Sequence, residues 1–529
     1  MVICQDTRYL QQNRKIARKR LTEKLDLLFN GEQSKAGKKI QKLQARKHKQ
    51  RQRSKKKYGG VSEDADKLEA QETTLFAMFK PPVHRGMKEL DRAAFSLIVP
   101  VMALRVPTQS VGPAKQKLMT DILKVPKLRN VVNDTTDTNK LILLDPAITS
   151  PVSASPALQS LMQENKWEMV AHKVTLDYSH WSADEILKAV LPDASEAPTS
   201  YEQIGHIAHM NLRTQYHEYR KLIGQVILDK SPTVRTVVNK LDTIDNTFRN
   251  FQMEVLAGEP EFVARVRENE CVFEFDYSKV YWNSRLQDEH ERMVKRFDKG
   301  SSICDVMAGV GPFTVPAAKR GCLVWANDLN PASHEALVNN VQRNKVQGRV
   351  RTYNMDGREF IRQAFADYIK QTGETGATKL EPIPKSTSAS KSKKDEKKEE
   401  EPAIEVRSRS FDHVVMNLPA IALEFLDAFR GIFSSLDKAV QPNLPFIHAH
   451  CFTKCLDAPE RDILQRACRA LGYPEDQYTE LEATAHFVRR VAPNKDMYCL
   501  SLRLPSSIAY AKPDEPEDAT AKKRKIDEQ

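Results

Sequence analysis

The sequence predicts an α/β protein whose C-terminal half folds as a doubly wound, Rossmann-like sheet. First, short apolar runs alternate with helical stretches from residue 276 onward, which is typical of parallel βαβ units. Second, the first of these runs leads into a turn with two glycines, Gly309 and Gly311, as in folds that bind a nucleotide beside the first strand. The runs predicted to be strands are 302–307, 322–326, 350–353, 412–416, 445–450 and 497–502.

Length and composition limit the alternatives. A chain of 529 residues is too long for one core, so we expect several units. There is no apolar run of about 18 residues, so we expect no membrane span. The eight cysteines are scattered, which favours a reducing compartment. The net charge of +12 comes from residues 1–60, which hold 19 Lys and Arg against four Asp and Glu, whereas the rest of the chain holds 63 against 66.

Residues 1–75 are predicted to form a basic tail and linker. Residues 11–30 show helical spacing of apolar residues, and Lys and Arg dominate residues 51–57. A solvated, flexible tail is the first interpretation, and electrostatic attachment to phosphate is the second.

Three further units are predicted. Residues 76–150 form one compact unit that ends at a Ser/Pro-rich linker, 149–156, and residues 165–275 form a small mixed α/β domain. In that domain we expect strands at 221–229, 234–238 and 272–275 and a helix at 183–190. The C-terminal domain covers 276–510, with a disordered insertion at 371–410 whose run KSKKDEKKEEE cannot bury a core. Residues 511–529 form a polar tail in which KKRK is either a nuclear import signal or a soluble end.

The ends of successive strands predict a cofactor site that does not hold a pyrophosphate. The glycine turn follows Asp305, and Thr314 stands where a dinucleotide site would prefer a third glycine. Asp328 ends the next strand, 23 residues after Asp305, which suits an acid that binds ribose hydroxyls, although a helix cap is the alternative. Asp356 and Gly357 follow the third strand, where a carboxylate could hold an adenine amino group or merely form a turn.

Asn417, Leu418 and Pro419 follow the fourth strand. An amide beside a turn fixed by proline suits a planar, amino-bearing substrate, and a plain turn is the alternative. The segment HAHCFTKC, residues 448–455, has Cys-x3-Cys spacing, and we interpret it as a buried strand rather than a metal site. No metal is predicted.

These residues and several longer stretches resemble the archaeal and eukaryotic tRNA (guanine-37-N1)-methyltransferase family. The resemblance covers residues 76–505 apart from the insertion. It implies a class I methyltransferase domain that uses S-adenosyl-L-methionine, a small middle domain, and an N-terminal domain that contacts the outer corner of tRNA. It also implies a monomer that methylates guanosine 37, beside the anticodon, in cytoplasm, mitochondrial matrix and nucleus. The segments that carry it are FKPPVHRGMKELDRAAF, EQIGHIAHMNLR, VVNKLDTIDNTFRNFQMEVLAGE, FDYSKVYWNSRLQDEHERM, DVMAGVGPF, ANDLNP and MNLPAIALEFLDAF.

The resemblance assigns roles to individual residues. It places the general base on Glu289, the catalytic arginine on Arg249 and the substrate-holding amide on Asn417. N1 of guanine carries a proton and is a poor nucleophile, so a carboxylate must take that proton, while a guanidinium stabilises the charge that develops on O6. The predicted substrate contacts are Tyr281 and Pro419, and the predicted cofactor contacts are His290, Asp328, Leu329, Asp356, Gly357, Asn417, Asp305, Gly309 and Gly311.

Two other functions stay open at this point. One is the related wybutosine-pathway enzyme, which transfers the aminocarboxypropyl arm of the same cofactor. The other is a non-catalytic RNA- or ribosome-binding protein, which the basic tail favours. The stretch VICQDTRYLQQNRKIARKRLTEKLDLLFNGE resembles the C-terminal tail of mitochondrial class I release-factor-like ribosome-rescue proteins. The Gly-Gly-Gln loop of those proteins is absent, so no hydrolase activity is implied.

Overall fold

The computed structural model of the chain describes residues 78–135, 138–193, 197–244, 251–372, 409–436 and 442–512. The predicted basic tail, most of the predicted insertion and the polar C-terminal tail therefore lie outside the described residues. The chain divides into two compact units, one containing Ser96–Leu176 and the other containing Pro81–Phe95 together with the chain from Asp177 onward. No helix of the described residues combines the length and apolarity needed to cross a bilayer.

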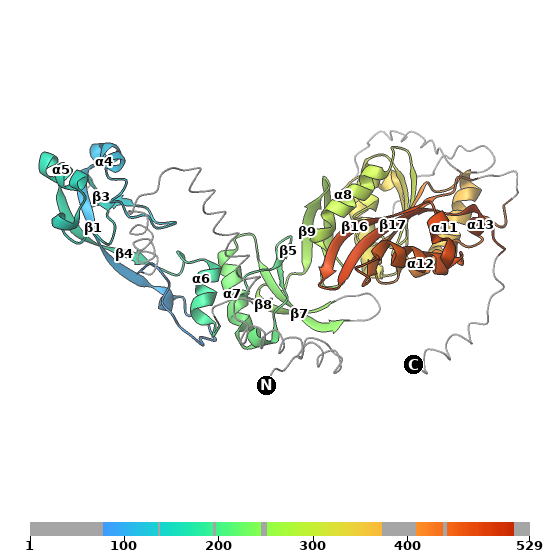
Figure 1. The fold of residues 1–529 in the computed structure, drawn as a ribbon, viewed down its shortest axis with the longest axis horizontal. Helices are drawn as coiled ribbons and strands as arrows, with labels where there is room; N and C mark the ends of the chain where they lie inside the picture. The colour runs from blue at the N-terminus through green and yellow to red at the C-terminus, as the bar shows by residue number, and fades with distance from the viewer. Residues whose placement is uncertain are drawn as a thin grey trace, which may run out of the picture. The chain divides into compact units, whose positions relative to one another are not determined.

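The first unit is an antiparallel sheet covered by helices on one face (Figure 1). Its strands lie in the order β2 (Val131–Asn133), β3 (Asn139–Leu143), β1 (Leu97–Pro107) and β4 (Glu168–Leu176). Helices α4 (Val111–Lys117) and α5 (Pro156–Asn165) contribute Ala114, Leu158 and Leu161 to a core shared with Leu104 and Ile142 of the sheet.

The predicted end of this unit at residue 150 is wrong. Strand β4 pairs with β1 from Leu97 opposite Leu176 to Arg105 opposite Glu168, so the unit extends to the end of β4. The Ser/Pro-rich stretch begins helices instead of linking domains: the Ser155 side chain accepts a hydrogen bond from the Leu158 N–H, and a proline occupies the first turn of α5. Both features are typical of a helix N-terminus.

The small middle domain is a mixed sheet backed by helices. Its strand order is β5 (Glu202–Ile204), β6 (Ile207–Met210), β7 (Thr236–Ile244) and β8 (Phe251–Gly258), and only β6 and β7 are parallel. Helix α6 (Ala183–Val190) forms where predicted. Residues 81–95 belong with this domain, because the N–H of His84 donates to the Ala189 carbonyl and that of Gly86 to the Val190 carbonyl at the end of α6.

The strand predicted at 221–229 is instead helix α7 (Arg220–Lys230). The apolar residues of this stretch are too dense to separate a period of two from a helical period, and tertiary packing decides. Gly224 shows how closely the helix approaches the sheet, since a Cβ added there would lie 2.5 Å from the Cβ of Leu256 in β8.

The C-terminal domain has a seven-stranded sheet in the order β13-β12-β11-β14-β15-β17-β16. The five strands β11 (Ser302–Asp305), β12 (Leu323–Asn327), β13 (Val350–Tyr353), β14 (His413–Met416) and β15 (Phe446–Thr453) are parallel, which confirms the doubly wound prediction. Strand β17 (Lys495–Arg503) runs antiparallel to β15, and to β16 (Ala483–Ala492), which the sequence did not reveal. Strand β16 is an edge strand with mostly exposed side chains, so it lacks a clean apolar pattern.

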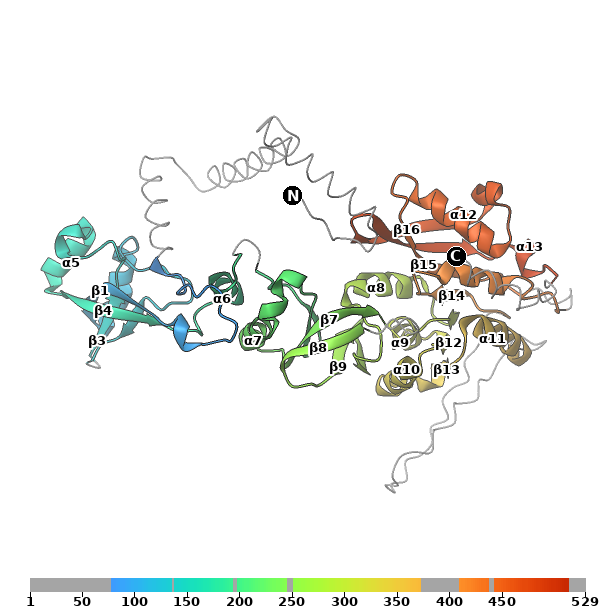
Figure 2. The ribbon, with the colours of Figure 1, turned by 90° about the horizontal axis from the view of Figure 1, so that it is seen from below.

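Helices cover both faces of this sheet, and in Figure 2 the strands lie between α9 and α10 on one side and α11 on the other. Strand residues alternate between the faces: Ile303 and Val415 pack with α8 (Gln287–Arg296), α9 (Thr314–Lys319) and α10 (Pro331–Arg343). Cys304 and Val414 pack with α11 (Gly357–Thr372), the 3-10 helix Ala422–Phe429 (η8), and α12 (Pro459–Leu471). Because the inner strands of the sheet are buried on both faces, apolar residues follow one another along them, as in β12.

The hairpin of β9 (Val263–Glu268) and β10 (Cys271–Asp276) belongs to this domain, so the predicted boundary at 275–276 moves to about residue 262. Two asparagines of α10 bind it: Asn340 Oδ1 accepts from the Glu274 N–H at 2.8 Å, and Asn344 Oδ1 accepts from the Val272 N–H at 2.9 Å.

Candidate active site

The carboxyl ends of β11 and β14 form the point at which the sheet changes winding direction. From β11 the chain moves outward through β12 to β13, and then returns to place β14 on the other side of β11. Ligands of doubly wound sheets bind in the crevice at this point. The predicted glycine turn follows β11 and the predicted Asn417–Pro419 turn follows β14, so the topology places both at the crevice.

The two glycines of the turn are needed for different reasons. Gly309 has φ +56°, and a Cβ added to it would meet no atom within 4 Å, so it faces open space. Gly311 has φ +97°, and an added Cβ would lie 2.8 Å from Leu337 Cδ1 of α10. Gly309 therefore lets a ligand approach the backbone, whereas Gly311 lets the turn pack against α10.

Asp328 ties the glycine turn to the end of β12. Its Oδ2 accepts from the Gly309 N–H at 2.8 Å and its Oδ1 from the Asn330 N–H at 2.9 Å. Burial raises the pKa of the Asp328 carboxyl, although these two N–H groups oppose the rise. The next residue, Leu329, is half exposed, so the turn presents an apolar side chain beside a carboxylate.

Asp356 and Gly357 begin α11. Asp356 Oδ1 accepts from the Arg358 N–H at 2.8 Å, so the carboxylate caps the first turn of the helix, where the sequence had left a plain turn as the alternative. A Cβ on Gly357 would lie 2.8 Å from Phe425 Cε1 of η8, so this position requires glycine for packing. The cap uses one carboxylate oxygen, and the predicted contact with a cofactor would use the other.

Three buried polar atoms that lack a hydrogen-bond partner among the described residues lie on or just beyond the neighbouring strands β11, β14 and β15, whereas the other such atoms lie elsewhere. They are Asp305 Oδ1 at the end of β11, Asn417 Oδ1 just beyond β14, and His450 Nδ1 in β15. Asp305 lies opposite Val415 and Met416 lies opposite Ala449, so the pleat directs these three side chains to the face covered by α8 and α9. Unpaired buried polar atoms are costly, and a polar ligand in the crevice would satisfy them.

Asp305 supports the turn from beneath it. It is fully buried, and its Oδ2 accepts a hydrogen bond from the Thr314 hydroxyl at 2.6 Å, at the start of α9. Burial raises the pKa of Asp305 to about 7, against the effect of the Thr314 bond. Thr314, which stands where a dinucleotide-binding motif would have its third glycine, thus holds the carboxylate of Asp305 in place at the end of β11.

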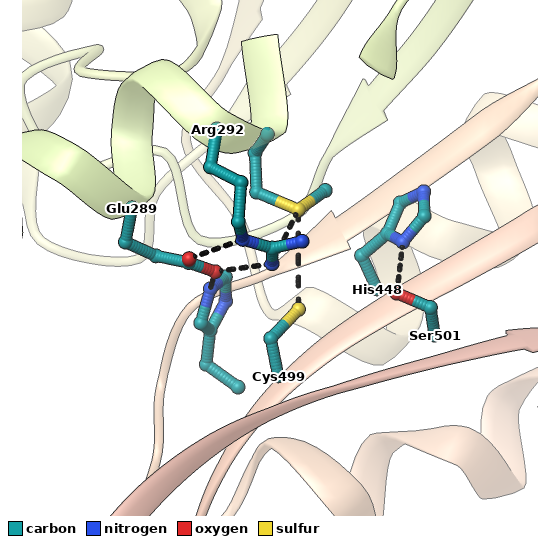
Figure 3. Close-up of polar contacts among 7 residues, drawn as sticks. Glu289, Arg292, His448, Cys499 and Ser501 are labelled. Carbon is teal, nitrogen blue, oxygen red and sulfur yellow. Dashed lines mark hydrogen bonds and ion pairs between the residues drawn. The ribbon is translucent and has the colours of Figure 1, made fainter. Parts of the chain in front are cut away.

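Glu289 is a buried carboxylate on α8 with strong partners (Figure 3). Arg292, one turn further along, donates from Nε to Oε2 at 2.6 Å and from Nη2 to Oε1 at 2.7 Å. His450 reaches Oε1 with Nε2 at 2.7 Å. Burial alone would raise the pKa of Glu289, but the bonds from Arg292 and His450 outweigh it and hold the pKa at about 2.

His450 is the functional candidate that sequence reasoning missed, because HAHCFTKC was interpreted as packing alone. That interpretation suits His448, which is buried and bonded through Nδ1 to the Ser501 hydroxyl at 2.8 Å. His450 differs: burial would lower its pKa, but Cys499 and Glu289 raise the pKa to about 10. The sequence offered no signal for it, since alternation along β15 places both histidines on the same face of the sheet and only the distant Glu289 distinguishes them.

Glu289, His450 and Cys499 offer ligand atoms that all lie within 4.8 Å of one another, which is a possible metal-binding geometry among the described residues. The Arg292 guanidinium already neutralises Glu289 from the same side. This cluster is therefore accounted for as a buried ion pair with a neighbouring thiol.

His290 is fixed beside the same site. Its Nδ1 donates to Glu268 Oε1 of β9 at 2.5 Å, and both side chains are buried. Its ring packs edge-on against Phe313 at 4.8 Å between centroids, and Phe313 also stacks on His450 at 5.7 Å. Phe313 thus connects the predicted cofactor residue His290 with the ion pair of Glu289.

The predicted substrate residues lie on loops. Tyr281 is half exposed, and its hydroxyl accepts from Asn283 Nδ2 at 3.1 Å. Pro419 is anchored to β15, because its carbonyl accepts from the Phe452 N–H at 2.9 Å. Arg249 lies outside the described residues, in the connection between β7 and β8.

Comparison with known proteins identifies the family to which the sequence and the fold are similar. Residues 264–378 match the TRM5/TYW2 methyltransferase domain, and residues 183–261 match the TYW2 N-terminal domain. A tRNA (guanine(37)-N(1))-methyltransferase of Batrachochytrium dendrobatidis is 44% identical over 82% of this chain and 92% of its own length. The Schizosaccharomyces pombe protein of the same name is 43% identical over 81% of this chain and 96% of its own length.

A solved complex of aTrm5 with tRNALeu has the same fold, with a TM-score of 0.51 and 18% identity over 76% of this chain and all of that one. Sequence identity over most of both chains, together with the seven-stranded sheet and its glycine turn, leads to one conclusion. The chain belongs to the tRNA (guanine(37)-N(1))-methyltransferase family.

Proposed function

We propose that this chain transfers the methyl group of S-adenosyl-L-methionine to N1 of guanosine 37 in tRNA. The observation that carries the proposal is the buried carboxylate of Glu289 on the face where Asp305, Asn417 and His450 leave polar atoms unpaired. The family relatives, 44% and 43% identical, bear the name of this activity.

The crevice residues fit the cofactor. Open space at Gly309 lets a ligand lie against the backbone. The Asp328 carboxylate can accept hydrogen bonds from the ribose hydroxyls, because the N–H groups of Gly309 and Asn330 leave some of its lone pairs free. Leu329 would cover the adenine ring, and the second oxygen of Asp356 would accept its amino group. The remaining predicted contacts are His290, Gly357, Asp305, Gly311 and Asn417. The bound cofactor supplies an electrophilic methyl group on a sulfonium, with its own leaving group.

The chain's residues supply proton transfer and orientation. Glu289 would accept the N1 proton as the methyl group arrives. Asn417, whose Oδ1 lacks a partner among the described residues, would hold the guanine amino group, with Pro419 and Tyr281 bordering the base. Arg249 would stabilise the charge that develops on O6.

A second candidate is transfer of the aminocarboxypropyl arm, because the matched domain families include TYW2. The two reactions differ in which carbon next to sulfur meets the nucleophile. Both relatives described above are named for methyl transfer, which favours the first candidate.

The test uses cofactor labelled either in the methyl group or in the carboxyl group, and tRNA transcripts with guanosine or adenosine at position 37. Nucleosides are then identified by mass spectrometry. Methyl label in 1-methylguanosine from the guanosine transcript alone is expected. Carboxyl label in RNA would establish the second candidate, and equal methyl label on both transcripts would contradict the choice of N1 of guanosine 37.

The proposal extends to organisation and location. The unit Ser96–Leu176 would contact the outer corner of tRNA, and the chain would act as a monomer without a metal. It would serve cytoplasmic and mitochondrial tRNAs and occur in cytoplasm, mitochondrial matrix and nucleus. The support is the resemblance of the sequence to its family, and fractionation of cells that express a tagged chain would test the location.

A further inference from the structure

Glu289 is poorly prepared to accept a proton in the arrangement described. Three donors point at its two oxygens: Arg292 through Nε and Nη2, and His450 through Nε2. A proton added to this carboxylate would leave the buried His450 cation and the partly buried Arg292 cation facing a neutral acid, and the pKa of about 2 expresses that cost. A base for N1 of guanine must first lose one of its cationic partners.

Of the two partners, Arg292 is the one that can leave. His450 is fully buried, stacked on Phe313 and enclosed by the strands of the sheet. The Arg292 side chain is 23% exposed and lies on the outer part of α8, with a long, flexible stem. Figure 3 shows its guanidinium reaching back along α8 to Glu289, between the helix and Cys499 of β17.

Further basic side chains lie near Arg292. Arg296 lies four residues further along α8, on the same side of the helix, and is exposed. His486 of β16 lies opposite Cys499 and is exposed. Partial burial is the largest cause that lowers the pKa of His486, and the charges of Arg292 and Arg296 lower this pKa further. Neither Arg296 nor Arg489, three residues after His486 in β16, has an ion pair among the described residues. An RNA backbone is the natural anion for such a surface in a tRNA-modifying protein.

We propose that Arg292 is a phosphate-binding residue of the RNA site, which exchanges its ion pair with Glu289 for a phosphodiester of the anticodon loop. The inference rests on the proposed function. Withdrawal of Arg292 leaves Glu289 bonded to His450, which keeps the carboxylate oriented and opens Oε2. The N1–H bond then breaks toward Glu289 as N1 bonds to the methyl carbon, and the electrons of the carbon–sulfur bond stay on sulfur.

The first test measures the affinity for a tRNA transcript, with S-adenosylhomocysteine present, at a series of salt concentrations. Arg292→Met should reduce the slope of log Kd against log salt by about 0.7–0.9, the contribution of one phosphate contact. The matched control is Arg469→Met on α12, since Arg469 also makes a two-point pair, with Glu475 at 2.9 and 2.7 Å, but packs on the other face of the sheet. The control should keep the wild-type slope. An unchanged slope in Arg292→Met would overturn the proposal.

A second measurement leaves the protein intact, so it holds even if the variant does not fold. For the wild-type chain, the slope of log Kd against log salt should fall by at least as much when methylphosphonates, which carry no charge, replace the phosphodiesters of the anticodon loop. Wild-type slopes that are equal for both RNAs would contradict a phosphate contact there. Neither measurement requires turnover, so a wild-type chain that binds tRNA without forming 1-methylguanosine would refute the proposed function and leave the contact established.

Kinetics separates phosphate binding from a purely structural role. In Arg292→Met the loss should fall mainly on kcat/KM for tRNA, roughly tenfold, and exceed the loss in kcat, because Arg292 has left Glu289 in the complex. If Arg292 instead stays on Glu289 during the reaction, the loss will fall on kcat with unchanged tRNA affinity, and the proposal is wrong.

Discussion

Replacing His450 with Phe tests whether a buried imidazolium holds the catalytic carboxylate. The substitution keeps a ring to stack on Phe313 and removes the 2.7 Å bond to Glu289. Removing one partner of a buried ion pair costs about 3–5 kcal/mol, and Arg292 still bonds Glu289, so we expect about 3 kcal/mol. In a domain of about 200 residues this corresponds to a melting temperature roughly 6–12 °C lower.

The pH dependence of this loss is the sharper measurement. The pKa of His450 is raised from 6.5 to about 10 in the folded chain, so its contribution is complete below pH 6.5 and is lost as pH rises through 10. The pKa of Glu289 is lowered from 4.5 to about 2, so its contribution is complete above pH 4.5 and is lost as pH falls through 2. The difference in unfolding free energy between wild type and His450→Phe should therefore be largest between pH 4.5 and 6.5 and shrink toward pH 10.

The assay is thermal or urea unfolding followed by near-ultraviolet circular dichroism over this range of pH. His448→Phe is the matched control, two residues away in the same strand. Burial, with the charge of His413, lowers the pKa of His448 well below 6.5, so His448→Phe should gain relative to wild type as pH falls below 6.5. The reasoning is refuted if the loss in His450→Phe does not shrink from pH 6.5 toward pH 10, since His450 would then be neutral at Glu289.

Three further outcomes follow from the site. Glu289→Gln should lower turnover by about 10²–10⁴-fold without abolishing binding of S-adenosylhomocysteine, measured by calorimetry, and unchanged turnover would remove Glu289 from the role of base. Both glycines have a positive φ, so alanine strains the turn at either position. Gly311→Ala should lower the melting temperature more than Gly309→Ala, because its Cβ also meets Leu337 at 2.8 Å, whereas Gly309→Ala should weaken cofactor binding more, because its Cβ enters open space; the reverse ranking would contradict the two roles. Deleting residues 1–60 should leave methylation of tRNA transcripts intact, and loss of activity would assign the basic tail a part in the reaction.

The sequence by itself determined the features that depend on one short segment. Four of the parallel strands, β11, β12, β14 and β15, lie inside the sheet and are mostly buried, so their apolar residues can be recognised without their partners, whereas the edge strand β13 is only partly buried. The glycine turn and the carboxylates Asp328 and Asp356 stand directly after such runs, and parallel strands bring their ends together at one edge. The fold class and the strand-end candidates could therefore be predicted locally, whereas His290 and Leu329 became candidates only through the resemblance to the family.

Tertiary structure alone decided the features that depend on a distant partner. Strand β4 belongs to the first unit because it pairs with β1, and β16 exists because β17 offers it an edge, although its own side chains are mostly exposed. His450 meets Glu289 across 161 residues, so no local pattern could distinguish it from His448. Burial then makes the charge of each partner depend on the other, because a buried charged group is stable only beside a group of opposite charge. For Glu289 those groups are His450 and Arg292.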